Sequence, residues 1–143
     1  MENDFLNLKG DLKVRVNNED LMVLDGVAVA STLAATKNYK AVWLANTQSY
    51  AIQLVFTGTP AGNFKLQASN DLGSPGASSE TQRQATITNW TDIADTATTI
   101  SAAGDLMYNV QNAGYNYVRL VWTATGAGTT PVLTVARCFT KGS

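Results

Sequence analysis

Short runs of β-branched, aromatic and aliphatic residues recur along the 143-residue chain, and nearly every run ends at Gly, Asn, Asp or Pro. Almost no stretch keeps the apolar period of an amphipathic helix. Many short strands separated by turn residues are typical of two-sheet β proteins. We therefore predict an all-β fold, an antiparallel β-sandwich or jelly roll, whose length allows it to bury a core without metals or disulfides.

The strongest strand signals are two stretches, 52–56 and 64–68, in which apolar and other residues alternate, and a third stretch near the C-terminus follows the same logic. Ile52, Leu54 and Phe56 share one predicted face, as do Phe64, Leu66 and Ala68 on the next strand and Val118, Leu120 and Trp122 near the C-terminus. Turn residues at 57–62 and 125–131 predict two hairpins. The strands are predicted at residues 12–16, 21–24, 27–31, 39–45, 50–57, 63–69, 85–89, 98–101, 106–110, 117–124 and 132–139, with an exposed loop at 71–84.

The N-terminal part of the chain differs from the rest. Residues 1–20 are polar and charged and are predicted to form an arm, and residues 21–143 form a single β-sandwich domain. Within it, residues 21–45 hold a hairpin and lead-in strands, and residues 46–143 form the jelly-roll body. Asp25-Gly26 is a strong hairpin signal, but both flanking arms are apolar on both faces. Such arms need a second partner, either the sandwich itself or another subunit. The candidate interface residues are Leu21, Met22, Val23, Val27 and Val29.

The absence of histidine excludes several classes of function. Without imidazole, a His-based triad, a Cys-His dyad and a His-bearing zinc site are all ruled out. Charged residues make up 15% of the chain and its net charge is -1, which gives little attraction to nucleic acid or an anionic membrane. We therefore predict a protein that is not an enzyme, with no cofactor, no nucleic-acid partner and no membrane partner. The single cysteine, Cys138, is expected to be a buried apolar side chain of the last strand.

Loop carboxylates leave two chemical alternatives open. A glycoside hydrolase could use Asp71 and Asp92 if they lie within about 10 Å of each other. Asn70-Asp71 and the segment 92–95 could instead supply oxygen ligands to calcium, although the dense pattern of an EF-hand is missing. Solvated turn carboxylates that cap strands are the simpler interpretation.

Aromatic residues near predicted strand ends suggest a glycan site. Trp90, Tyr115 and Tyr117 could form a stacking platform for sugar rings, with Tyr115 and Tyr117 on one face because they alternate with Asn116. The competing interpretation places Trp90 and Trp122 in the core of the sandwich.

Three motifs resemble the galactose-binding-like, or discoidin-like, jelly roll. They are Phe64-Lys65-Leu66-Gln67-Ala68-Ser69-Asn70-Asp71, then Asn89-Trp90-Thr91-Asp92-Ile93, then Gly114-Tyr115-Asn116-Tyr117-Val118-Arg119-Leu120-Val121. Their order is similar to that of the family over residues 50–140. The resemblance implies a strand scaffold without an active site.

The longer stretches 50–71 and 100–130 look like parts of small virion proteins of tailed bacteriophages. This resemblance implies a non-enzymatic structural protein, either a capsid decoration or a component of a tail or fibre. Its expected partners are copies of itself, with a trimer as the first expectation, and other virion proteins. The acidic start of the chain lacks the features of a secretory signal, so we expect synthesis in the host cytoplasm and a final location in the virion. The alternative function is a carbohydrate-binding module that reads a host-surface glycan.

Overall fold

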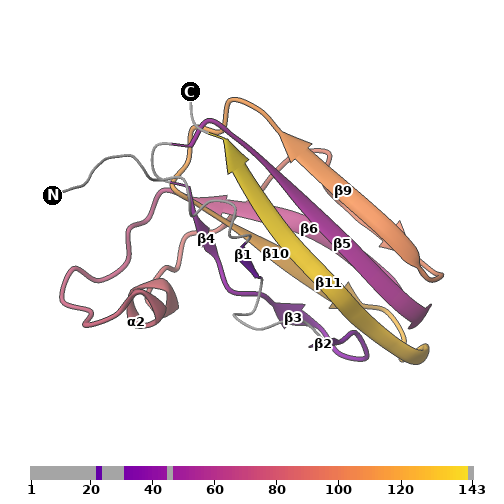
Figure 1. Cartoon of the computed structure of the whole chain (residues 1–143). Helices are drawn as coiled ribbons and strands as arrows, with labels where there is room; N and C mark the ends of the chain where they lie inside the picture. The colour runs from indigo at the N-terminus through magenta and orange to yellow at the C-terminus, as the bar shows by residue number, and fades with distance from the viewer. Residues whose placement is uncertain (1–21, 24–30, 45–46, 142–143) are drawn as a thin grey trace, which may run out of the picture.

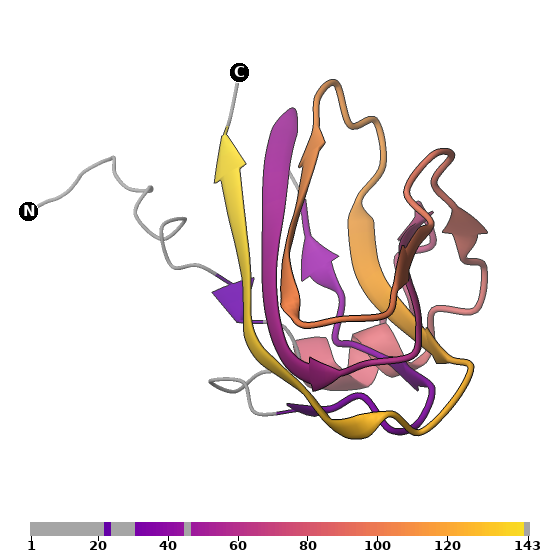
Figure 2. The same cartoon turned by 90° about the vertical axis from the view of Figure 1, so that its right-hand side faces the viewer.

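The computed structural model describes residues 22–23, 31–44 and 47–141, and these residues form two packed antiparallel β-sheets (Figure 1). The side view shows the two layers facing each other (Figure 2). The predicted all-β sandwich is therefore confirmed. The predicted arm over residues 1–20 lies outside the described residues, as does the predicted strand 12–16.

Sheet A has β11 and β5 at its centre. The strand β11 (Thr129–Lys141) pairs with β5 (Ser49–Thr59), and β5 pairs with β9 (Gly104–Val110), which forms one edge. At the other edge, two short strands both pair with β11: β1 (Met22–Val23) and β2 (Ser31–Thr32). All of these pairings are antiparallel.

Sheet B has β10 and β6 at its centre. The strand β10 (Tyr117–Ala124) pairs with β6 (Gly62–Ser69) over its whole length. The short strands β3 (Lys37–Asn38) and β4 (Val42–Trp43) pair with the free side of β10. On the other side, β6 pairs with β7 (Thr91–Asp92) and β8 (Thr98–Ile100).

The core lies between the sheets and contains the inward residues that the alternation predicted. Phe64, Leu66, Val118, Leu120 and Trp122 of sheet B are fully buried against the inward residues of β5 and β11, which are Tyr50, Ile52, Leu54, Phe56, Leu133, Ala136 and Cys138. The Phe64 and Trp122 ring centroids lie 4.6 Å apart. Cys138 is fully buried, as expected, and its burial raises the pKa of its thiol to about 12.

The two predicted hairpins are wrong. β5 belongs to sheet A and β6 to sheet B, so the turn at 57–62 carries the chain across the core instead of joining neighbouring strands. The same is true of β10 and β11. Gly58 and Gly128 have positive φ angles of 76° and 64°, which let the chain turn in these two connections. The jelly roll itself stays a prediction, which this repeated crossing between sheets favours.

Two other predicted elements are also corrected. The predicted strand 85–89 is absent, because Ala85 ends the helix α2 (Glu80–Ala85), which lies in the stretch predicted as a loop. Residues 39–45 do not form one strand, since β3 and β4 are separated by a connection over 39–41. Of the predicted N-terminal hairpin, only Met22 and Val23 are described, and they pair with Cys138 and Arg137 of β11. In the part of the chain described, no helix has both the length and the apolar character needed to cross a membrane.

Candidate functional site

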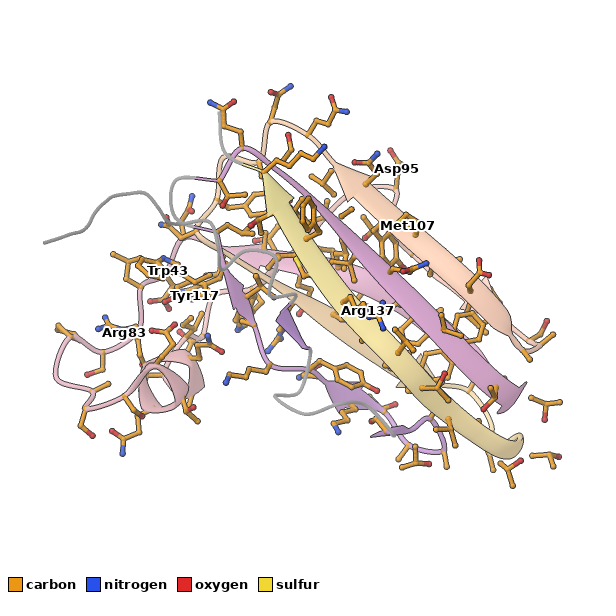
Figure 3. All side chains as sticks on the ribbon, viewed as in Figure 1. Trp43, Arg83, Asp95, Met107, Tyr117 and Arg137 are labelled. Carbon is orange, nitrogen blue, oxygen red and sulfur yellow. The ribbon has the colours of Figure 1, made fainter. Side chains whose placement is uncertain are left out.

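The structure does not bring the three predicted platform residues together. Tyr117 is 2% exposed and packs with Ala41 and Ile87 in a small cluster on the outer side of sheet B. Its hydroxyl donates to Glu80 Oε2 of α2 at 2.9 Å, and burial, followed by the hydrogen bond with Glu80, raises its pKa to about 12. Tyr117 as part of a sugar platform is therefore wrong, because the α2 segment covers the ring. Figure 3 shows Tyr117 and Arg83 at the end of the molecule that carries α2.

Tyr115 lies in a different environment. It packs against the main core, where its hydroxyl is 2.7 Å from that of Tyr50 and the two rings meet edge to face. Because Tyr117 belongs to the small outer cluster, the two residues do not share a face as predicted. Tyr115 lies just before the start of β10, where the strict alternation of a strand does not apply.

Trp90 is half-buried and its ring is already stacked. Its Nε1 donates to the Ile87 carbonyl at 3.2 Å, and the Arg119 guanidinium lies 4.2 Å from the ring centroid. One face of the indole is thus taken up by a cation, a contact that orients both side chains. The sequence allowed either an exposed platform or a core residue here, and Trp90 is neither of these.

Trp90 and Arg119 line a groove of about 510 Å³ on the outer side of sheet B, which we call the Arg119 groove. It lies between the connection that follows β3, the helix α2 and the strand β10. Its lining residues are Asn38, Tyr39, Lys40, Ala41, Thr81, Gln84, Ala85, Trp90 and Arg119. The Gln84 side chain holds the helix to the lead-in connection, because its Oε1 accepts the Ala41 N–H at 3.2 Å.

Arg119 is held in place by two neighbours. In addition to the Trp90 ring, the Gln67 Oε1 on β6 accepts hydrogen bonds from Arg119 Nε at 2.9 Å and Nη2 at 2.7 Å. Gln67 stands directly opposite Arg119 in the register of β6 and β10. Partial burial lowers the pKa of the guanidinium, which nevertheless remains charged. The groove therefore presents a fixed cation.

A second groove of about 700 Å³ takes part of its lining from the sequence neighbours of Trp90, and we call it the Asp71 groove. It collects Asp71, Asp92 and Tyr115 together with Ala68, Ser69, Asn70, Asn89, Thr91 and Ile93. The two carboxylates of the predicted glycosidase thus border one groove, and so do Asn70 and Asp92 of the predicted calcium site. Trp90 borders the other groove, so Trp90 and Tyr115 do not form one platform.

The carboxylates of the Asp71 groove are engaged in structural contacts. Asp71 accepts the backbone N–H groups of Gly73 at 2.9 Å and Thr88 at 3.1 Å, and these bonds lower its pKa. Asp92 is bonded by Lys65 at 2.8 Å and Gln67 at 2.7 Å, which lower its pKa too. A general acid needs a raised pKa, so neither group is suited to protonate a leaving group. Among the residues with described positions, no three Asp, Glu or Cys side chains gather as a metal site would require.

The candidate interface of residues 21–29 is mostly outside the described chain. Leu21, Val27 and Val29 lie outside it, and Met22 and Val23 are described as the backbone of β1 at the edge of sheet A. Next to this edge, the outer face of sheet A carries the rows Phe139–Ala51–Asn109, Arg137–Gln53–Met107 and Val135–Val55–Asp105. Phe139 is 44% and Met107 55% exposed. Figure 3 shows Met107 and Arg137 on the strands of this sheet.

The fold and these surfaces define a class, a β-sandwich protein with two polar grooves beside one sheet and a weakly charged outer face on the other. Comparison with protein-family models and with curated proteins finds no match to the chain.

Sequence reasoning missed Lys40 and Arg119 as site residues. The signal for Arg119 was present, because the alternation of 117–124 places it on the outward face of a strand whose inward residues are all apolar. The alternation does not show that Trp90 and α2, from a distant part of the chain, cover that face. The groove could therefore not be predicted from the strand alone.

Proposed function

We propose that the chain is a non-enzymatic structural protein of a tailed-bacteriophage virion that associates with copies of itself and with other virion proteins. The observation that carries this proposal is the outer face of sheet A. Three of its positions, Ala51, Val55 and Val135, are small or branched apolar residues, and Phe139 and Met107 add two large exposed ones. The same rows hold two charged residues of opposite sign, Arg137 and Asp105, and two amides, Gln53 and Asn109. The virion context rests on the resemblance of residues 50–71 and 100–130 to small virion proteins.

The edge of this sheet supports association with a second copy. β9 pairs with β5 on one side only among the described strands, and its sole charged residue is Asp105. Edge strands of monomeric proteins are commonly blocked by lysine, proline or a bulge. β9 contains neither lysine nor proline and pairs with β5 in an unbroken register from Gly104 to Val110. Such an edge can receive a strand of another subunit through backbone hydrogen bonds.

Light scattering on the purified chain tests self-association. We expect an oligomer at micromolar concentration and a shift toward monomer in Met107→Asp, because the substitution places a carboxylate in the buried face. Leu72→Asp is the matched control, since Leu72 is 54% exposed but lies in the loop beside α2. A monomeric wild-type protein, or equal oligomers in both variants, would overturn this part of the proposal.

Mass spectrometry of purified virions tests the virion role separately. The phage that encodes the chain is expected to carry it in many copies per particle, and deletion of its gene is expected to change particle stability or tail assembly. Absence of the chain from intact particles would contradict the virion role even if the protein oligomerises.

A second candidate function is glycan binding, which the two adjacent grooves favour. Together they line one side of the molecule with amide, hydroxyl and aromatic groups, as in sites that hold sugars. Titration of the protein with monosaccharides, followed by amide chemical shifts, tests this function. Shifts confined to the groove residues would support it, and the absence of shifts with every sugar would exclude it.

A further inference from the structure

We infer that the Arg119 groove binds the carboxylate of an acidic sugar, with Arg119 and Lys40 as the groups that recognise the charge. The inference rests on the second candidate function, glycan binding, and adds to it the chemical class of the ligand. It does not depend on the virion role.

The lining of the Arg119 groove is positively charged. Its lining contains Lys40 and Arg119 and no aspartate or glutamate, although the chain as a whole has a net charge of -1. Two cations that line one groove from separate segments, the connection after β3 and the strand β10, favour an anionic ligand there. The nearest acid on α2, Glu80, is engaged by the Tyr117 hydroxyl and by Gln84 Nε2.

The Arg119 guanidinium has hydrogen-bond donors that no described residue uses. A guanidinium has five N–H groups, and the bonds to Gln67 Oε1 come from Nε and Nη2 only. Within the described part of the chain, the ion pairs are Lys65–Asp92 and Arg83–Glu80, so no carboxylate there neutralises Arg119. A planar carboxylate matches the remaining edge of the fork and can accept two parallel hydrogen bonds.

The Arg119 side chain is held in one orientation before any ligand binds. The Trp90 ring covers one face of the guanidinium, and Gln67 fixes its inner edge. Because the side chain is already ordered, binding an anion costs less conformational entropy than it would at a free surface arginine. Partial burial without a counter-ion also makes the charge unfavourable where it stands, and a bound carboxylate relieves that cost.

The remaining lining identifies the rest of the ligand as polar. Asn38 and Thr81 supply amide and hydroxyl groups that suit sugar hydroxyls, and the indole of Trp90 offers an apolar contact for a ring carbon. The Gln84 amide is already bonded to the Ala41 N–H and to Glu80 and shapes the wall of the groove. A volume of about 510 Å³ is sufficient for one or two sugar units. The groove therefore fits a uronic-acid residue better than a bare anion.

A matched ligand pair tests the inference directly. Calorimetry and amide chemical shifts are measured with methyl glucuronide and with methyl glucoside, which differ only in the carboxylate. We expect the glucuronide to bind roughly tenfold or more tightly, with shifts at Lys40, Trp90 and Arg119. Inorganic phosphate and an oligothymidylate serve as other anions and are expected to bind more weakly than the glucuronide.

Three variants then locate the site. Arg119→Lys keeps the charge but loses the fork and is expected to lose most of the preference for the glucuronide. Lys40→Gln, at an exposed position, gives a second reduction that does not depend on refolding around Arg119. Arg137→Gln, on the outer face of sheet A, is the control and is expected to change nothing.

The outcomes distinguish failure of the acidic-sugar preference from failure of glycan binding itself. Equal binding of both sugars at the groove overturns the acidic-sugar inference and leaves glycan binding intact. No binding of either sugar overturns both. Tighter binding of phosphate or oligothymidylate, or an unchanged preference in Arg119→Lys and Lys40→Gln, also overturns the inference.

Discussion

At the residue scale, Trp122 is the largest fully buried side chain among the described residues. It is fully buried beside Phe64, and its Nε1 donates to the Leu33 carbonyl at 2.9 Å. Trp122→Phe is expected to destabilise the fold by about 1–3 kcal/mol, because the Leu33 carbonyl loses its partner, and Trp122→Ala by about 3–5 kcal/mol. Urea unfolding measures both. Trp43→Phe is the control, since Trp43 is 58% exposed, and an equal loss there would contradict this account.

Gly128 is a residue-scale constraint of a different kind. It has a positive φ of 64°, and a Cβ at this position would collide with the Thr59 carbonyl oxygen. Gly128→Ala is therefore expected to lower the unfolding free energy by about 1–3 kcal/mol, as strained backbone does. Gly114→Ala is the matched control, because nothing lies within 4 Å of a Cβ there. Equal thermal midpoints for the two variants would show that the turn adapts.

Single residues also show how far alternation can be trusted. Val118, Leu120 and Trp122 were predicted to point inward, and all are fully buried. The outward residues Tyr117 and Val121 are buried too, at 2% and 6% exposure. A period of two identifies which residues share a face, but not whether a remote segment covers that face. The predicted sugar platform of Trp90, Tyr115 and Tyr117 does not form for this reason. The segment that contains α2 and Trp90 covers the outward face on which Tyr117 lies.

At the element scale, the segment between β6 and β7 depends on Asp71. One carboxylate oxygen accepts the N–H of Gly73 and the other that of Thr88, so Asp71 joins the two ends of the stretch that contains α2. We expect Asp71→Ala to speed amide exchange at Gly73 and Thr88 and proteolysis between them, while the sheets stay protected. Asp105→Ala, on an exposed strand position, is the control.

The contacts of Asp71 are expected to weaken in acid, because the pKa of its carboxyl group is lowered in the folded protein. Backbone hydrogen bonds lower the pKa of Asp71 in the folded protein, so its contribution is present above the usual value of 3.8 and is lost as the pH falls below it. Exchange at Gly73 and Thr88, corrected for its intrinsic pH dependence, should therefore rise toward that of the variant only in acid. The same difference between wild type and variant at pH 3 and pH 7 would contradict this.

The sequence correctly predicted the positions of the long strands. It did not predict which strands pair, because strand partners are distant in the sequence. The cores of β5, β6, β10 and β11 match the predicted segments, since alternation and turn residues are local signals. The turns were found too, but a turn does not specify which sheet the next strand joins. α2 carried a signal that was overlooked. Ser79-Glu80-Thr81-Gln82 has the spacing of a capping box, and Ser79 Oγ accepts the Gln82 N–H at 3.2 Å.

At the scale of the whole molecule, the two proposals use opposite sides. Association through sheet A would bury Met107 and Phe139, and the Arg119 groove lies on the outer side of sheet B. A subunit docked on sheet A would thus leave the groove open to a ligand. The sequence could supply the low charge and the missing histidine, which disfavour catalysis. It could not supply the groove, because Lys40, Trp90 and Arg119 come from three distant segments that line one surface only once sheet B and α2 are in place.

The stability of the whole fold is expected to decline in alkaline solution. Burial raises the pKa of Cys138 from 9.0 to about 12, and burial also raises the pKa of Tyr50 above its usual 10.0. Both groups are neutral when protonated, so the unfolded chain releases these protons first. Stability is then full below about pH 9 and falls as the pH rises toward 12, by about 1.4 kcal/mol per pH unit for each fully titrating group.

Urea unfolding midpoints at pH 7.5, 9.5 and 10.5 measure this decline. Cys138→Ala is expected to remove the part that begins near pH 9 and to leave the part above pH 10, because Tyr50 and its partner Tyr115 are unchanged. The difference between the two curves therefore isolates the thiol. A wild-type midpoint that stays constant to pH 10.5 would mean that Cys138 titrates in the folded protein as it does in the unfolded chain, which would contradict the burial of its thiol.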